Sequence, residues 1–183
     1  MNWTPCWQWQ KGEIPNEICD YILNSIDGKL YEKGTTSNHN KKQARNVNIQ
    51  FNNSNWINGM LCGYIRYANH ENFQYNLSNE DKESAQISKY SKGEYYKDHI
   101  DFGNGDHLTR KLSITVQLSD ENDYEGGDLI FDVNNFEGHK IQAFRGKGSV
   151  IVFDSRITHK VTPVNRGVRY SLVKWYHGDE PLK

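Results

Sequence analysis

The chain has 183 residues, a formal net charge of −1 and 36% hydrophobic residues, a size typical of one domain with a buried core. The balanced charge gives no electrostatic case for a nucleic acid or an anionic membrane as partner. No segment approaches the run of roughly 20 apolar residues that spans a bilayer.

The cysteines and the N-terminus favour a soluble, cytoplasmic protein. Cys6, Cys19 and Cys62 form an odd, scattered set without a CxxC pair, which is typical of a reducing compartment rather than of a disulfide framework. Residues 1–7 have neither a basic start nor an apolar run, so we expect no signal peptide. No feature of the sequence indicates an oligomeric state.

Two amphipathic helices are predicted in the first half of the chain. The first begins at Pro15-Asn16-Glu17, continues with apolar residues at helical spacing and ends at Gly28. The second follows Asn55. Its apolar stripe is predicted to consist of Trp56, Met60, Leu61, Tyr64, Ile65 and Ala68.

Residues 29–54, between the two helices, are rich in Asn, Lys, Gly and Thr. Within them, residues 47–51 alternate like a strand. The remainder is a candidate mobile loop or substrate lid, because loops on a rigid scaffold often carry specificity. Arg45 lies in this segment and is expected to be solvated rather than to face a site.

Short alternating segments follow one another from about residue 85, separated by turn signals such as Gly103-Asn104-Gly105-Asp106 and Gly126-Gly127. The segments are residues 87–90, 95–100, 112–118, 129–133, 141–144, 150–153 and 168–175. Seven or eight short strands indicate an all-β sandwich or barrel, and a double-sheet jelly roll with two supporting N-terminal helices fits best. We expect a single domain over residues 1–183, with helical support over about 1–84 and a jelly-roll core over about 85–177.

His99-Ile100-Asp101 is the strongest candidate for chemistry. Side chains two apart on a strand share a face, so an imidazole nitrogen and a carboxylate oxygen can bind one metal ion. His159, which follows the apolar segment 149–153, is the candidate third ligand. Two His and one carboxylate form the facial triad of non-haem Fe(II) oxygenases, which leaves positions open for chemistry. The other histidines are expected to be structural or solvated: His39, His70, His107, His139 and His177.

Arg169 and Ser171 share one face of the last predicted strand. An Arg169 that points inward would be a buried charge in need of an anionic partner. A co-substrate carboxylate is one such partner, because guanidinium pairs with carboxylate through two parallel hydrogen bonds, and Ser171 can add another. The alternative is an outward Arg169 on a surface strand.

Together these residues resemble the Fe(II)- and 2-oxoglutarate-dependent dioxygenases, most closely the prolyl 4-hydroxylase-like branch that includes the bacterial PKHD-type hydroxylases. The resemblance covers about Ile87 to Trp175, and the order and spacing of its motifs agree with the family. The matching motifs are Tyr90, Gly93 and Tyr96 ahead of H-x-D, residues 112–120, the turn at 124–129, residues 148–154, His159, Pro163-Val164 and residues 167–170.

The resemblance implies a mainly β, cupin-like double-stranded β-helix with iron held by His99, Asp101 and His159. It also implies 2-oxoglutarate as co-substrate, with its far carboxylate on Arg169 and a hydrogen bond from Tyr90. Dioxygen is the oxidant, and ascorbate is a further candidate cofactor. The chain has Arg169 where collagen-type prolyl hydroxylases carry Lys, and Gln117 where some relatives have Tyr.

The function implied is hydroxylation of an unactivated C–H bond with release of succinate and CO₂. A prolyl residue of a peptide or protein is the leading substrate; a free amino acid or another residue type stays open, because fold and cofactor do not determine the substrate. A non-catalytic jelly-roll binding module is an alternative function of a different class. The triad and the arginine together argue against it, because a binding module does not need all four residues. A cupin-type metalloenzyme without 2-oxoglutarate would carry two neighbouring His, a Glu and a further His instead of H-x-D.

Overall fold

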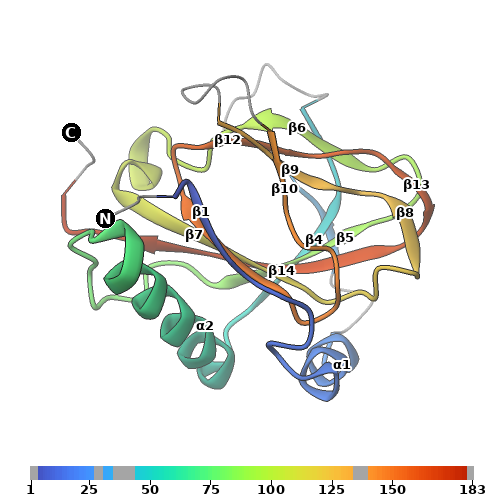
Figure 1. The fold of residues 1–183 in the computed structure, drawn as a ribbon, viewed down its shortest axis with the longest axis horizontal. Helices are drawn as coiled ribbons and strands as arrows, with labels where there is room; N and C mark the ends of the chain where they lie inside the picture. Colours follow the sequence, from blue (N-terminus) through green and yellow to red (C-terminus); the bar gives the residue numbers. More distant parts are fainter. Residues whose placement is uncertain (1–3, 27–30, 35–43, 134–139, 181–183) are drawn as a thin grey trace.

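The computed structural model describes residues 4–26, 31–34, 44–133 and 140–180. Two antiparallel sheets face each other as in a jelly roll, and both long helices cover the outer side of the larger sheet (Figure 1). The mainly β fold with two supporting helices is therefore confirmed. No helix in the described part of the chain is long and apolar enough to cross a bilayer.

The larger sheet has seven strands among the described residues. Their order is β1 (Cys6–Trp9), β11 (Val150–Asp154), β7 (Arg110–Gln117), β14 (Arg169–His177), β5 (Ala85–Tyr90), β4 (Asn48–Asn52) and β2 (Glu32–Lys33). The smaller sheet has the order β10 (Lys140–Gln142), β9 (Leu129–Asp132), β12 (Thr158–Val161), β6 (Tyr95–His99) and β3 (Arg45–Asn46). A separate ribbon pairs β13 (Val164–Gly167) with β8 (Tyr124–Gly126).

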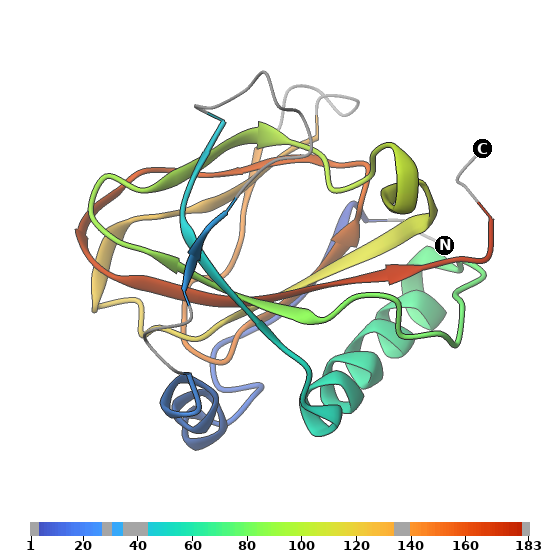
Figure 2. The same ribbon diagram turned by 180° about the vertical axis from the view of Figure 1, so that it is seen from behind.

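The predicted strand at residues 47–51 is confirmed as β4, but helical support is an incomplete description of residues 1–84. In Figure 2 the cyan strand of this segment, β4, crosses the molecule and leads into α2 (Asn55–Ala68). β1, β2 and β4 extend the larger sheet at its two edges, and β3 extends the smaller one. The N-terminal half therefore completes both sheets as well as covering one of them.

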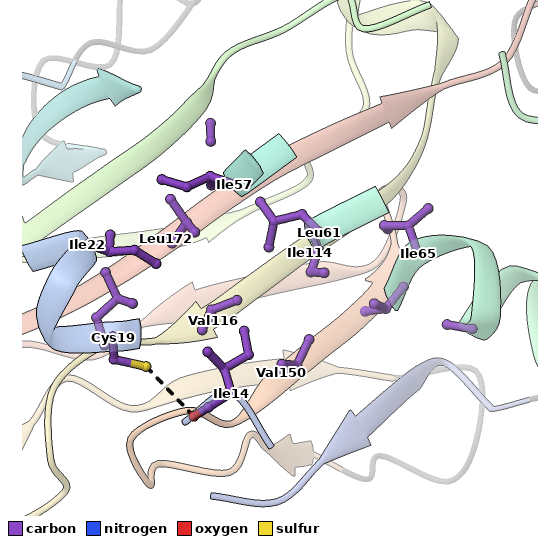
Figure 3. Close-up of a cluster of buried hydrophobic side chains, with 14 of the residues drawn as sticks. Ile14, Cys19, Ile22, Ile57, Leu61, Ile65, Ile114, Val116, Val150 and Leu172 are labelled. Carbon is purple, nitrogen blue, oxygen red and sulfur yellow. Dashed lines mark hydrogen bonds between the residues drawn. The ribbon is translucent and has the colours of Figure 1, made fainter. Parts of the chain in front are cut away.

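Helix α1 (Asn16–Asn24) is shorter than predicted, and α2 (Asn55–Ala68) begins where predicted. The buried stripe of α2 runs through Ile57, which the predicted stripe omitted, whereas Trp56 is 43% exposed. Two short elements complete the helices: the π-turn η1 (Asn69–Phe73) and the 3₁₀ turn η2 (Gly105–Thr109). In Figure 3, Ile57, Leu61 and Ile65 of α2 lie over Ile114, Val150 and Leu172 of the sheet.

A second apolar cluster lies between the sheets. Phe131 of β9 and Phe153 of β11 are fully buried there, with ring centroids 4.8 Å apart. Because the larger sheet is covered on both sides, alternate residues of each central strand serve different layers. This alternation directs one set of side chains to the helices and the other into the space between the sheets.

Candidate metal centre

Three of the predicted site residues converge at one end of the smaller sheet. β12 pairs with β6 so that His159 lies directly opposite His99. Asp101 approaches both rings, with Oδ1 3.7 Å from His99 Nε2 and Oδ2 3.6 Å from His159 Nε2. One candidate ligand atom from each residue lies within 4.8 Å of the others, a cluster compact enough for one metal ion.

Asp101 reaches the cluster by a different route from the one predicted. β6 ends at His99, so the two side chains do not share a regular strand. The backbone bends instead, and the amides of Asp101 and Phe102 both donate to the carbonyl oxygen of Ser155 at 2.9 Å. The β11–β12 connection thereby positions the carboxylate, a contact that no local pattern of the sequence indicates.

Both imidazoles are oriented by backbone carbonyls. His99 Nδ1 lies 2.8 Å from the oxygen of Lys97, and His159 Nδ1 lies 2.9 Å from the oxygen of Ile157. A carbonyl only accepts, so each Nδ1 carries a proton, and each ring turns its Nε2 toward the cluster. Burial and the neighbouring His159 lower the pKa of His99, so this ring is neutral at neutral pH, as a ligand must be.

The Asp101 carboxylate is ionised although it is buried. Burial acts to raise its pKa, whereas protonated His159 or His99, the charge of Arg110 and a hydrogen bond from Ser113 act to lower it; with neutral imidazoles, Arg110 and Ser113 are the groups that favour the ionised form. Ser113 Oγ donates to Asp101 Oδ2 at 2.7 Å and lies 2.9 Å from Ser155 Oγ. An ionised carboxylate with one oxygen held in place is a ready metal ligand.

A buried ion pair supports the main chain of Asp101. Arg110 Nη1 donates to the Asp101 carbonyl at 3.0 Å, while its Nε and Nη2 donate to the two carboxylate oxygens of Glu83. His177 Nε2 also contacts Glu83 Oε1, at 2.6 Å, so His177 is structural, as predicted. Burial acts to raise the pKa of Glu83, but the bonds from His177 and Arg110 lower it to about 2.

The cluster opens into a cavity of about 420 Å³ between the two sheets. The wall opposite the smaller sheet is formed by β5, β7 and β14, whose inward residues are largely polar. The lining from these strands includes Gln86, Ser88, Tyr90, Thr115, Arg169, Ser171 and Trp175. The three remaining predicted site residues, Tyr90, Arg169 and Ser171, thus share one cavity with the His–Asp–His cluster.

Arg169 points inward and is only 1% exposed, which excludes the outward alternative. Its Nη2 donates to Gln117 Oε1 at 2.9 Å and its Nη1 to Ser171 Oγ at 3.5 Å, and it lies 5.3 Å from the Tyr90 ring centroid. Nε has no partner, and within the described ranges no carboxylate pairs with this guanidinium. Gln117 therefore holds the arginine through a neutral amide.

The Gly126-Gly127 turn is confirmed and has a packing reason. Both glycines have positive φ, at 70° and 62°, a conformation that favours glycine. A Cβ on Gly127 would lie 3.1 Å from Arg169 Cδ and 3.0 Å from Val164 Cγ2. The turn therefore lets the backbone approach the arginine stem closely.

Sequence reasoning placed one lining residue, Arg45, wrongly. Arg45 lies on the cavity wall with its guanidinium carbon 4.8 Å from the Tyr96 ring centroid, not in bulk solvent. His107 of η2 also lines the cavity. His70 is exposed as predicted, whereas His39, His139 and residues 29–30 and 35–43 of the candidate lid lie outside the described residues.

Comparisons with known proteins agree with this geometry. The model of the 2OG-Fe(II) oxygenase superfamily matches residues 85–177. A PKHD-type hydroxylase of Idiomarina loihiensis is 32% identical over 90 residues, which are 49% of this chain and 39% of that protein. A PKHD-type hydroxylase of Synechococcus sp. (strain CC9605) is 40% identical over 93 residues, 50% of this chain and 40% of that protein. The matches thus span about two fifths of these relatives.

The fold resembles solved structures over nearly its whole length. A Pseudomonas putida prolyl-4-hydroxylase superimposes on this chain with a TM-score of 0.74 and 19% sequence identity. The superposition includes 95% of this chain and 92% of the prolyl-4-hydroxylase chain. At that identity the likeness establishes a shared fold, which includes the residues outside the family match.

Proposed function

Because the chain belongs to the 2OG-Fe(II) oxygenase superfamily, we propose that it is an Fe(II)- and 2-oxoglutarate-dependent dioxygenase that hydroxylates an unactivated C–H bond and releases succinate and CO₂. A prolyl residue of a peptide or protein is the leading substrate. One observation carries the proposal: a compact His–Asp–His cluster shares a cavity with a buried guanidinium that has no described acidic partner.

The donor set fits Fe(II). His99 and His159 present their Nε2 atoms and Asp101 presents a carboxylate, the set typical of non-haem iron oxygenases. The three residues lie together on the wall of the cavity that the smaller sheet forms. A metal ion bound to them would therefore face the cavity, where other ligands can reach it. When bound, Fe(II) together with 2-oxoglutarate and dioxygen supplies the oxidising power that breaks the C–H bond; the protein holds the ligand geometry and excludes water.

The opposite wall fits the far carboxylate of 2-oxoglutarate. A guanidinium buried without an acid costs several kcal/mol, and a ligand carboxylate would offset this cost through two charge-assisted hydrogen bonds. Ser171 Oγ would donate one more, and the bond to Gln117 orients the arginine. Tyr90, paired with Arg169 across β5 and β14, would add a phenol donor.

The substrate proposal is supported by the relatives and neighbours. The sequence relatives are named PKHD-type hydroxylases, and a structural neighbour is named a prolyl-4-hydroxylase. A free amino acid stays an alternative substrate. The cytoplasmic location and a role for ascorbate stay predictions; adding and omitting ascorbate in the assay checks the latter.

The decisive assay follows two products at once. Purified protein is incubated with Fe(II), 2-oxoglutarate and proline-containing peptides, and succinate and the peptide mass are measured together. We expect succinate formation and a mass increase of one oxygen atom in the same samples, and neither when Fe(II) is omitted. Absence of succinate both with and without peptide, combined with retained binding of a peptide, would instead identify a non-catalytic jelly-roll binding module.

A further inference from the structure

We propose that Gln86 binds the peptide group that follows the target residue of a peptide substrate, an inference that rests on the function proposed above. Gln86 lies on β5 and lines the cavity of the His–Asp–His cluster. The residue is only 3% exposed, so it lies deep in this cavity rather than at its rim. Its one hydrogen-bond partner among the described residues is Ser88, so neither the candidate ligands nor Arg169 occupies its amide.

The register of the larger sheet places Gln86 beside the space between the metal cluster and the co-substrate arginine. Gln86 is paired with Val173 of β14, and Val173 is paired with Thr115 of β7. On the inner face of β7, Thr115 lies between Ser113, which holds a metal ligand, and Gln117, which holds the arginine. Because two strand spacings separate them, Gln86 lies about 10 Å to the side of Thr115 at the level of the backbone. It therefore flanks the space that 2-oxoglutarate has to span and does not lie within it.

The Gln86 amide keeps hydrogen-bonding capacity for a ligand. Its Nε2 donates to Ser88 Oγ at 2.8 Å, and the side chain forms no other hydrogen bond within the part of the chain that the structure describes. A carboxamide has two N–H donors and one oxygen acceptor, so one donor and the acceptor remain. Gln50 Oε1, on the neighbouring strand, is fully enclosed without a partner, whereas the Gln86 amide lines the cavity. A polar group so deeply buried costs stability unless a partner in the cavity completes its hydrogen bonds.

The bond to Ser88 also fixes the direction of the amide before a ligand arrives. Ser88 is buried on the same face of β5 and is paired with Ser171 of β14. Because the amide is anchored at one end, it loses less side-chain entropy on binding. Gln86 is thus a preorganised donor and acceptor rather than a freely rotating side chain.

The lining beside Gln86 offers room for a peptide. On its other side Gln86 is paired with Phe51 of β4. Phe51 lines the same cavity and is 57% exposed, so the lining changes from a buried amide to an open aromatic ring within one strand spacing. A peptide that crosses this edge can pack an apolar side chain on Phe51 while one of its peptide groups contacts Gln86. A single amino acid offers no flanking residue for the ring.

A peptide group complements a carboxamide, because each has a carbonyl oxygen that accepts and an N–H that donates. For a prolyl target, the peptide group before the residue lacks an N–H, so the group after it is the one that offers both. A free amino acid has a carboxylate at this place, which only accepts. It would leave Gln86 Oε1 without a donor and bring a negative charge against it. The amide therefore favours a residue within a chain over a free amino acid.

The test compares kcat/KM for three compounds. The first is a capped, single-proline peptide from the assay above, the second is the same peptide with an ester in place of the peptide bond after the proline, and the third is free proline. The ester lacks the N–H that Gln86 Oε1 would accept. We expect the peptide to exceed the ester by about threefold to tenfold, the range for one neutral hydrogen bond, and free proline to be the poorest substrate. Equal values for peptide and ester, or preferred turnover of free proline, would overturn the proposal without any variant.

A variant locates the preference in the structure. Gln86→Met keeps a side chain of similar length but removes the amide donor and acceptor. We expect kcat/KM to fall more for the peptide than for the ester, so that the ratio of the two approaches one. Gln10→Met is the matched control, because it makes the same substitution at an exposed position outside the cavity lining, and it should keep the wild-type ratio.

Three results would count against the role of Gln86. The first is a wild-type ratio of peptide to ester in Gln86→Met, and the second is an equal loss of the ratio in Gln10→Met. The third is a Gln86→Met effect confined to the KM for 2-oxoglutarate, which would assign the amide to the co-substrate.

The proposed function and this inference fail in different ways. If the wild-type protein forms no succinate with or without these compounds, the proposed function itself fails, and this inference fails with it. Succinate formation with hydroxylation of free proline alone would retain the proposed oxygenase and overturn only the peptide role of Gln86.

Discussion

On β14, Leu172 packs under the helices, whereas Arg169 and Ser171 point to the opposite side and line the cavity. β7 repeats the contrast: Leu112, Ile114 and Val116 join the helix-covered core, while Ser113, Thr115 and Gln117 face inward. The two faces of one sheet are equally buried but differ in chemistry. Apolar burial on the outer face stabilises the fold, whereas the polar groups on the inner face cost stability and, under the proposed function, serve to bind the co-substrate.

The largest effect is expected where the inner face meets the smaller sheet. His99→Ala removes one of the three candidate iron ligands, so we expect loss of Co(II) or Fe(II) binding and of all succinate formation. The loss should exceed the roughly 10–100-fold that removal of a ligand's hydrogen-bond partner costs. Metal titration followed by absorbance measures it, and iron-dependent turnover in this variant would disprove the ligand assignment.

A pair of variants separates the two faces directly. Arg169→Met on the inner face should raise the KM for 2-oxoglutarate by roughly a hundredfold or more, because charge-assisted hydrogen bonds are lost. Its free energy of unfolding should stay within about 1 kcal/mol or rise, because an unpaired buried charge is removed.

The matched variant on the outer face is Ile114→Ala. We expect it to lower the free energy of unfolding by about 2–5 kcal/mol through the cavity it leaves, with the KM for 2-oxoglutarate unchanged. Denaturant unfolding and initial-rate kinetics measure both variants. An Arg169→Met protein that is destabilised as much as Ile114→Ala would show that Arg169 serves the fold rather than a ligand.

A smaller effect is expected from the hydroxyl that orients Asp101. Ser113→Ala leaves the three ligands in place but removes the 2.7 Å bond to Asp101 Oδ2. We expect metal affinity to fall about 10–100-fold with little change in the KM for 2-oxoglutarate. Ser113→Thr, which keeps a hydroxyl, is the control; an equal loss in both variants would point to packing rather than to the hydrogen bond.

The smallest effect on turnover is expected from the Glu83 ion pair, whose contribution is to stability. Its pKa of about 2 in the folded protein lies below the ordinary 4.5, so its contribution to stability is present above pH 4.5 and is lost as the pH falls toward 2. Glu83→Gln should therefore flatten the fall in thermal stability over this pH window. Calorimetry of both proteins from pH 2 to 7 tests this, and parallel curves would contradict it.

Residue type and local spacing were sufficient to find the main parts of the site. The H-x-D motif indicates two candidate ligands within three residues. The alternation in residues 169–171 places Arg169 and Ser171 on one face of a strand, independently of the rest of the fold. The same alternation predicted the central strands β5, β7, β11 and β14. The alternation uses only neighbouring residues, for which covalent geometry sets the direction of the side chains. For H-x-D the residue types alone carried the inference, because Asp101 lies beyond the end of β6.

The features that were missed depend on distant segments. β1, β8, β12 and β13 have three or four residues each and are stabilised by pairing with strands elsewhere in the chain. The bend that carries Asp101 to the cluster is held by Ser155, which is 54 residues further along. Arg45 is drawn out of solvent by Tyr96 and Gly34.

The sequence by itself determined the residue types of the candidate ligand set, the shared face of Arg169 and Ser171 and the mainly β class; the last two follow from the two-residue period of a strand, whereas the inward direction of Arg169 came from the structure. The tertiary structure alone decided that His99, Asp101 and His159 meet within 4.8 Å, that Gln117 rather than an acid holds Arg169, and that Arg45 joins the metal wall. The physical reason is that register between strands and the closing of one sheet over another are set by the packing of the whole chain.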